Sequence, residues 1–376
     1  MRKILYITGT RADYGLMADT LQRIRSHPQL ALQVAVTGMH LSPKYGMTVH
    51  EIEQAHLPIV ARIPTRVDER SAEGMSRSIG QMVVGFTDAI AAHRPDLLLL
   101  LGDRGEMLAG AIAALHLGVP VAHLHGGERS GTVDEPVRHA ITKLSHWHFV
   151  ATAASRERVV RMGERPEHVW VTGAPALDGL ATMPLPSRAD TLVDLGLPAG
   201  SHYALVLFHP VLQEARQAHA QTLALREALE RSVSDSGRAV VWLDPNADAG
   251  GGEILRALNG ALVRRIRHLP RPRFLAALRH ADLLAGNSSA GIIEAASFGT
   301  PVVNIGNRQR ARERNANTRD CEATVEAIAQ AVQAQLAHGP YTPGNVYGDG
   351  HAGERIVELL ARQPFAPDLL DKVNTY

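Results

Sequence analysis

Short apolar runs alternate with helical patterns along most of this chain, and that alternation restricts the possible folds more than any other feature. The runs that we interpret as strands of the first half are Lys3–Thr8, Leu30–Thr37, Asp96–Leu101, Val119–Leu124, Trp147–Ala151 and Val169–Thr172. Stretches between them, such as Gly105–Leu117 and Glu135–Leu144, repeat their apolar residues with the period of a helix. Strands that alternate with helices in this way predict a parallel sheet that is covered on both faces.

The alternation pauses at Thr182–Ser187, where two prolines indicate a linker. It then resumes with strands that we expect at Tyr203–Phe208, Ala239–Leu243, Asp282–Ala285 and Val302–Ile305. At 376 residues the chain is also too long for one ordinary core. We therefore predict an α/β fold of two doubly wound Rossmann-type domains, residues 1–182 and 187–352. Because ligands bind beyond the carboxyl ends of the strands in such sheets, we expect the two domains to face each other across a cleft.

Composition excludes several classes of protein. The formal net charge is +1, so no general electric field attracts nucleic acid or an acidic membrane. The apolar run Leu97–Leu101 is far shorter than the roughly 20 residues of a membrane span, and the chain enters a strand at Lys3 without a signal peptide. A single cysteine, Cys321, excludes an internal disulfide and a thiolate zinc site. We expect a cytoplasmic protein that binds neither nucleic acid nor membrane.

Neither a metal nor a cofactor is expected. His123 and His125 alternate on one strand, a spacing that can bind a metal, but polar strand ends beside a cleft produce the same pattern. The first loop, Gly9–Gly15, lacks the glycine fingerprint of dinucleotide-binding proteins, and no phosphate-binding Walker motif occurs.

The segment Gly286–Glu294 predicts a nucleotide site. It follows an apolar strand, and an amphipathic helix is expected to leave it. Free backbone N–H groups and the positive end of the helix dipole bind phosphate at such a turn. We expect Asn287 or Ser288 to cap the helix, and Glu294, about two turns into it, to accept hydrogen bonds from a ribose. The alternative is an ordinary capped helix. The binding residues expected in this segment are Asn287, Ser288, Ser289, Gly291 and Glu294.

Ionisable residues follow neighbouring strands of the first domain. They are Asp103, His125, Glu128, Asp134, Arg138 and His139. Carboxylates and imidazoles that gather at one sheet edge acquire the shifted pKa values that proton transfer needs. The alternative is a structural ion network that fixes a loop. Arg11 and Arg104 lie on turns at the same edge and are expected to neutralise a diphosphate.

The second domain offers three further candidates. His209 ends its first strand, which would place an imidazole at the cleft. Asn246 lies in a polar, glycine-rich loop that can contact a sugar. Phe274 is expected either to flank a uracil ring or to belong to the core.

These residues resemble a known family, the hydrolysing UDP-N-acetylglucosamine 2-epimerases of sialic and legionaminic acid synthesis. The motifs that carry the resemblance span the chain in order: Ile7–Asp13, Gly102–Arg104, Gly126–Glu128, Asp134–His139, Phe208–Pro210, Gly286–Glu294 and Phe298–Pro301. The resemblance implies a GT-B-like fold in which a terminal helix, within residues 353–376, completes the first domain. It further implies that UDP binds mainly to the second domain and that the protein is a homodimer or homotetramer.

The family's reaction eliminates UDP while a base removes the proton on C2, and water then adds to the resulting glycal. The resemblance implies that Asp103, Glu128, Asp134, His125 and His209 are catalytic. Some members carry a glutamate where this chain has His125, which leaves open whether His125 or Glu128 takes the proton.

The first hypothesis for the substrate is UDP-N-acetylglucosamine, which the enzyme would convert to UDP and N-acetylmannosamine. The alternatives are the same reaction on UDP-N,N'-diacetylbacillosamine, a non-hydrolysing epimerase, a GT-B glycosyltransferase and a non-catalytic UDP-sugar sensor.

Overall fold

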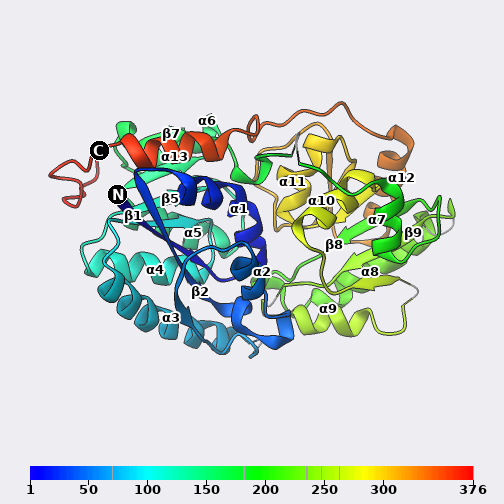
Figure 1. The fold of residues 1–376 in the computed structure, drawn as a ribbon. Coiled ribbons are helices and arrows are strands. Elements are labelled where there is room, and N and C mark those ends of the chain that lie inside the picture. The colour runs from blue at the N-terminus through cyan, green and yellow to red at the C-terminus, as the bar shows by residue number, and fades with distance from the viewer. Residues whose placement is uncertain (70, 181–182, 234–235, 247, 262, 376) are drawn as a thin grey trace. The chain divides into compact units, whose positions relative to one another are not determined.

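The computed structural model describes residues 1–69, 71–180, 183–233, 236–246, 248–261 and 263–375, so Thr182, where the predicted linker begins, lies outside the described residues (Figure 1). Contacts divide the chain into two units. Unit 1 comprises Met1–Glu128, Val133–Gly179 and Tyr347–Tyr376. Unit 2 comprises Arg129–Thr132 and Leu180–Val346. Among the helices of the described residues, none has the length and apolar character that crossing a bilayer requires.

Unit 1 is built on a parallel sheet of seven strands in the order β3-β2-β1-β4-β5-β6-β7. Its strands are β1 Arg2–Thr8, β2 Leu30–Thr37, β3 Ile59–Ile63, β4 Leu97–Leu101, β5 Val121–Leu124, β6 Trp147–Val150 and β7 Val169–Val171. Its helices are α1 Arg11–Ser26, α2 Val49–Gln54, α3 Ala72–His93, α4 Gly105–His116, α5 Asp134–Leu144, α6 Ala153–Arg161 and α13 Ala352–Arg362.

Unit 2 has a parallel sheet of six strands in the order β10-β9-β8-β11-β12-β13. Its strands are β8 Tyr203–Leu207, β9 Ala239–Leu243, β10 Arg264–Ile266, β11 Leu283–Gly286, β12 Val302–Ile305 and β13 Thr318–Cys321. Its helices are α7 Arg188–Leu195, α8 Ala218–Ser232, α9 Gly251–Ala257, α10 Arg271–His280, α11 Ser289–Ile293 and α12 Val325–His338.

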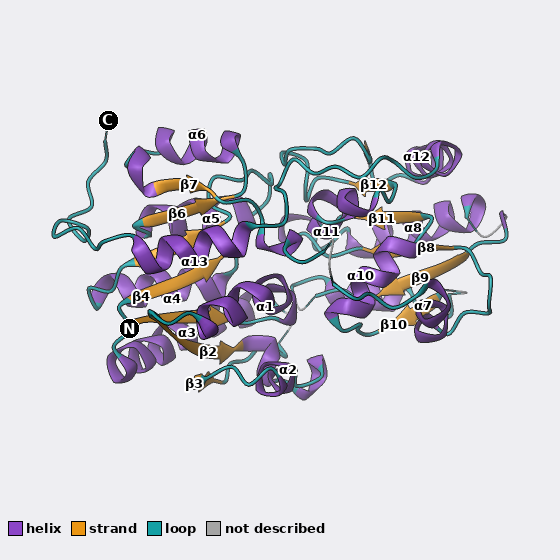
Figure 2. Ribbon diagram, turned by 45° about the horizontal axis from the view of Figure 1, so that its top comes forward, coloured by secondary structure: helices purple, strands orange, loops and turns teal. Residues whose placement is uncertain are grey.

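Helices cover both faces of each sheet (Figure 2). In unit 1, α1 and α13 pack on one face around residues such as Tyr6 and Ile356, and α3 and α4 pack on the other around residues such as Phe86. In unit 2, α8 and α12 cover one face, and α7 and α10 cover the other. The predicted fold class of two doubly wound α/β units is confirmed.

The sequence did not indicate three of the strands, β3, β10 and β13, and each lies at an edge of its sheet. An edge strand has a neighbour on one side only and is partly exposed, so polar residues replace the apolar run of a central strand. Arg264 and Arg265 of β10 are exposed in this way, and so are Arg319 and Asp320 of β13. The helix expected after Ser288 also differs, because α11 has five residues and Glu294 ends it.

Helix α13 returns the chain to unit 1. The carboxylate of Asp178 accepts hydrogen bonds from the backbone N–H groups of Ala352, at 2.8 Å, and Gly353. These are orphan donors of the first helical turn, so Asp178 fixes the start of the helix. Ile356 and Leu360 then enter the core that α1 covers.

Gly286 ends β11 with φ of +142°, and a β-carbon there would lie 2.0 Å from the carbonyl oxygen of Leu207 on β8. We therefore expect Gly286→Ala to lower the free energy of unfolding by more than about 2 kcal/mol, because both the backbone angle and the strand spacing must change. Urea denaturation measures this loss. The matched control is Gly252→Ala in α9, where no atom lies within 4 Å of the added carbon. Equal effects of the two substitutions would contradict the explanation.

Candidate active site

Arg138 joins two other predicted site residues of unit 1, Asp103 and Glu128. Asp103 follows β4 directly, and Glu128 lies in the loop after the neighbouring strand β5. Arg138 reaches both from α5: its guanidinium forms an ion pair with Asp103 and donates a hydrogen bond of 2.8 Å to the carbonyl oxygen of Glu128. The Arg138 side chain is buried. Because a buried guanidinium requires partners, these contacts fix the relative positions of the two loops.

His125 and Glu128 form a second pair at the same edge. Nδ1 of His125 contacts Oε1 of Glu128, and both residues are buried. His125 has φ of +63°, a left-handed conformation that costs roughly 1 kcal/mol or more for a residue with a β-carbon. The backbone thus holds the imidazole in a position that an ordinary strand end would not give it. With Nδ1 directed to the carboxylate, Nε2 is the ring nitrogen left for other chemistry.

The neighbouring His123 has a different environment. Its Nε2 contacts the carbonyl oxygen of Gly102 at 2.7 Å, and its Nδ1 contacts Oγ1 of Thr142 at 3.1 Å. Burial lowers the pKa of His123 to about 3, so the ring is neutral and structural. Among the described residues, no group of three metal-ligating side chains gathers here or elsewhere.

The other two predicted residues of this edge lie in α5. Asp134 is the first residue of the helix. His139 is half-buried, and its Nε2 lies 3.7 Å from Oε1 of Glu135. Burial lowers the pKa of His139, and the nearby Glu135 opposes that shift.

Arg11 and Arg104 each have a carboxylate partner. Arg11 begins α1, and its Nε lies 2.8 Å from Glu51. Arg104 precedes α4, and its Nε lies 3.2 Å from the buried carboxylate of Glu106. Both arginines therefore follow the carboxyl ends of adjacent strands, β1 and β4, as the sequence predicted.

The turn that carries Arg11 is fixed by Asp13. Its Oδ2 accepts hydrogen bonds from the backbone N–H groups of Gly9, at 3.1 Å, and Thr10, at 2.9 Å. Thr10 in turn accepts one from the N–H of Asp13, which completes a capping box. The pKa of Asp13 is raised to about 6: burial is the main cause, the charge of Glu106 acts in the same direction, and the hydrogen bonds that Asp13 accepts oppose the shift.

In unit 2, Asn287 holds the carboxyl ends of β8 and β11 together. Its side-chain oxygen accepts a hydrogen bond of 2.7 Å from the N–H of His209, and its side-chain nitrogen donates one of 2.8 Å to the carbonyl oxygen of His209. Nδ1 of His209 accepts a hydrogen bond from the N–H of Asn246, at 3.3 Å. Asn287 therefore positions His209, and it is Ser288 that caps α11.

Sequence reasoning missed three residues around this turn. Arg308 and Gln309 both donate to the carbonyl oxygen of Asn287, at 3.1 and 3.2 Å. Arg271 forms an ion pair with Glu294, the predicted ribose ligand. Burial raises the pKa of Glu294, and Arg271 opposes that shift. Only for Arg271 did the sequence offer a signal, its charge, because a buried carboxylate such as Glu294 requires a cation.

Two of the remaining predicted residues of unit 2, Gly291 and Phe274, pack against its core. A β-carbon on Gly291 would lie 3.0 Å from Val302 and 3.1 Å from Leu284, so this glycine lets α11 approach the sheet closely. Phe274 is half-buried against the core cluster under α10, and its contact with a uracil stays a prediction. Ser289 begins α11. Asn246 Nδ2 donates to Asp248 at 2.6 Å.

The raised pKa of Asp13 predicts a pH-dependent stability. An unfolded aspartate has a pKa of about 3.9, so its ionisation is less favourable in the folded protein, and stability falls as the pH rises from about 4 to 6. We expect Asp13→Asn to lack this decline, so its free energy of unfolding relative to wild type increases from pH 4 to pH 7.5. Urea denaturation at both pH values is the measurement, with Asp19→Asn, at a partly exposed position of α1, as control. If Asp13→Asn and wild type differ in free energy of unfolding by the same amount at both pH values, the raised pKa of Asp13 is contradicted.

The chain is similar to known proteins along most of its length. A family model described as UDP-N-acetylglucosamine 2-epimerase matches residues 22–361. The chain is 44% identical over 380 residues to the hydrolysing UDP-N,N'-diacetylbacillosamine 2-epimerase of Legionella pneumophila, with 100% of each chain covered. It is 34% identical to a UDP-N-acetylglucosamine 2-epimerase of Neisseria meningitidis, covering 96% of this chain and 95% of the other.

Among solved structures, the co-structure of S. aureus MnaA with UDP superimposes with a TM-score of 0.78 at 21% identity, and 96% of each chain is covered. That likeness shows a GT-B-like epimerase fold. Together with the family match over most of the chain, it leads to one conclusion: the chain belongs to the UDP-N-acetylglucosamine 2-epimerase family, as an enzyme of the hydrolysing type.

Proposed function

We propose that this enzyme hydrolyses UDP-N,N'-diacetylbacillosamine, with inversion at C2 of the sugar. The observation that carries the proposal is the 44% identity, over both whole chains, to an enzyme named for that substrate, against 34% for one named for UDP-N-acetylglucosamine. UDP-N-acetylglucosamine is the first substrate hypothesis from the sequence alone. The identities to these two relatives favour UDP-N,N'-diacetylbacillosamine instead.

The reaction divides into two steps. In the first, a base takes the proton from C2, its electron pair forms the C1=C2 double bond, and the C1–O bond breaks so that UDP leaves with its charge. In the second, water adds across the double bond, its hydroxyl to C1 and a proton to the opposite face of C2. The C2 proton is only weakly acidic, so a positioned base and a stabilised leaving group must act together.

His125 is our candidate for the C2 base. Glu128 fixes Nδ1, so it stabilises the imidazolium that forms when Nε2 accepts a proton. Glu128 is buried, with 2% of its surface exposed, which favours a role through His125 over direct contact with the sugar. Asp103, held by Arg138, and Asp134 are the candidate acids for the return of a proton to C2.

The leaving UDP requires cationic and N–H donors. We assign the diphosphate to Ser288, Ser289 and Arg11, with Arg104 as a further cation, and the ribose to Glu294. The first turn of α11 supplies backbone N–H groups, although a helix of five residues adds little dipole. His209, positioned by Asn287, is the candidate proton donor to the leaving phosphate oxygen.

Proton and phosphorus NMR in deuterated water tests the substrate assignment. We expect UDP-N,N'-diacetylbacillosamine to give free UDP and a released sugar that is deuterated and inverted at C2, because the C2 proton is replaced from solvent. We expect UDP-N-acetylglucosamine to react at least tenfold more slowly in kcat/KM, a difference of about 1.4 kcal/mol. Faster turnover of UDP-N-acetylglucosamine would overturn the assignment. If both UDP-sugars stay intact in the presence of the enzyme, the proposed reaction itself is rejected.

The catalytic assignment predicts that Asp103→Asn and His209→Ala lower kcat by roughly a hundredfold or more, because each removes a group that moves a proton. Binding of UDP, measured by calorimetry, should stay close to wild type.

Each variant has a matched control at the opposite end of the same strand. Asp96→Asn lies before β4, and His202→Ala lies before β8, and both side chains are exposed. Near-native turnover in the two site variants, or an equal loss in the controls, would reject the assignment.

A further inference from the structure

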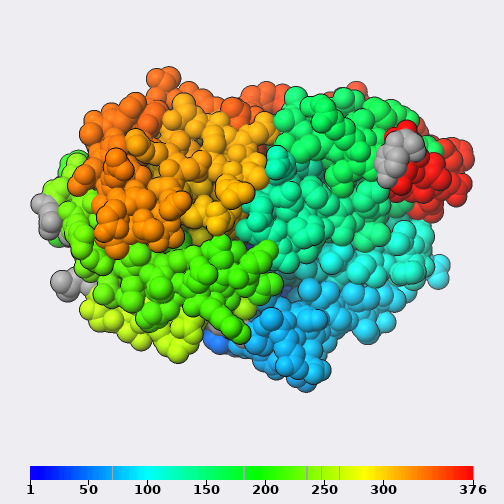
Figure 3. Space-filling model, turned by 180° about the vertical axis from the view of Figure 1, so that it is seen from behind, coloured from blue at the N-terminus to red at the C-terminus, as the bar shows by residue number. Residues whose placement is uncertain are grey.

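The segment that follows α13, from Gln363 to Thr375, is a packed part of unit 1, and we call it the C-terminal tail. Figure 3 shows it in red on the surface of unit 1. Phe365 stacks on Trp147 with ring centroids 5.3 Å apart, and the guanidinium of Arg2 lies 4.2 Å from the centre of the Phe365 ring. Leu369 is buried in the same core as α13. None of the functions proposed above uses this segment.

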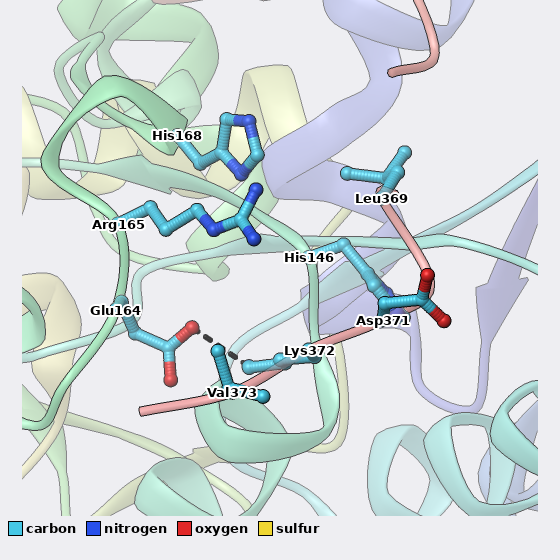
Figure 4. Close-up of a pocket in the computed structure, with 8 residues that line it drawn as sticks. All are labelled: His146, Glu164, Arg165, His168, Leu369, Asp371, Lys372 and Val373. Carbon is cyan, nitrogen blue, oxygen red and sulfur yellow. Dashed lines mark ion pairs between the residues drawn. The ribbon is translucent and has the colours of Figure 1, made fainter. Parts of the chain in front are cut away.

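Lys372 of the tail forms an ion pair with Glu164 (Figure 4), and it also contacts the carboxyl end of α5. Its Nζ donates to the carbonyl oxygen of Thr142, at 3.2 Å, and to that of Ser145. Carbonyl groups at a helix end lack partners within the helix, and the helix dipole makes a cation favourable there. The tail thus provides a cation, the Lys372 ammonium group, at the last turn of α5.

Glu164 holds Lys372 in that position. Its carboxylate is buried and lies 2.7 Å from Lys372, 2.6 Å from Lys143 and 2.9 Å from Nε2 of His148. Burial raises the pKa of Glu164, but its partners outweigh burial and bring that pKa to about 2. Burial lowers the pKa of Lys372 to about 8, against the charge of Glu164. Both groups are therefore ionised at neutral pH. The cluster joins the tail, α5 and the loop before β7.

The end of α5 that Lys372 contacts is close to the candidate active site. Thr142, whose carbonyl accepts from Lys372, also contacts His123 through its hydroxyl, and His123 contacts the carbonyl of Gly102, the residue before Asp103. Arg138 precedes Thr142 by four residues, so the two share a face of α5 and lie about 6 Å apart along its axis. A shift of this helix end would move Arg138 away from Asp103 and from the Glu128 carbonyl.

We propose that Lys372 is a positioning residue for the active site: by anchoring the carboxyl end of α5, it fixes Arg138 against Asp103 and the loop of Glu128. The proposal rests on the proposed function in one respect, namely that this arrangement is needed for turnover. Lys372 itself does not contact the substrate.

Lys372→Met tests the proposal, because methionine keeps most of the side-chain length and loses the charge and the donors. We expect kcat to fall by roughly tenfold, as small displacements of catalytic groups do, while KM and UDP affinity stay within about twofold. Amides of α5 should exchange hydrogen faster than in wild type. Lys372→Arg keeps the charge and should recover most of the lost kcat. The matched control is Asp368→Asn, which removes a tail ion pair of 2.8 Å with Arg165 and leaves α5 untouched.

Several outcomes would overturn the proposal. Unchanged α5 exchange or unchanged kcat in Lys372→Met would do so, and so would an equal loss in Asp368→Asn. A parallel loss of UDP binding and turnover, with a lowered melting temperature in both Lys372 variants, would show a general structural role instead. If the wild type turns over neither sugar, the proposed function fails by itself, while the exchange of α5 amides still decides whether Lys372 anchors this helix.

Discussion

The arrangement of unit 1 depends on the burial of the Arg138 guanidinium. A charge removed from water must be matched by partners, and Arg138 is matched by the Asp103 carboxylate and the Glu128 carbonyl. Those partners follow two different strands, so the arginine converts two loops into one rigid edge. The His125–Glu128 pair belongs to the same edge, because the loop that Arg138 fixes carries Glu128.

Unit 2 uses a neutral group for the equivalent purpose. Asn287 hydrogen-bonds both backbone groups of His209, and Gly286 allows the two strands to approach closely enough for this. An amide can satisfy a donor and an acceptor at once without the cost of burying a charge. In the turn beside it, Ser288 caps α11, because its side chain accepts a hydrogen bond from the N–H of Ala290.

Helix α5 links the chemistry to distant parts of the chain. Its first turns carry Asp134, Arg138 and His139, and its last turn is held by Lys372 of the C-terminal tail. Residues that are more than 200 positions apart thus meet at one helix. A rigid helix of this length passes a constraint at one end to the other, since its backbone hydrogen bonds are formed throughout.

The sequence by itself determined the two doubly wound sheets and, in unit 1, the sheet edge at which the candidate site residues gather. Central strands such as Leu97–Leu101 are apolar on both faces, and parallel strands bring their carboxyl ends to one side, so motifs that follow these strands must converge. Only the tertiary structure decided the edge strands, the length of α11 and the partners of each charge. Arg271 pairs with Glu294, and Lys372 pairs with Glu164, across separations that no local pattern records. Local periodicity reports which face of an element is buried, whereas the partner of a buried charge depends on how distant elements pack.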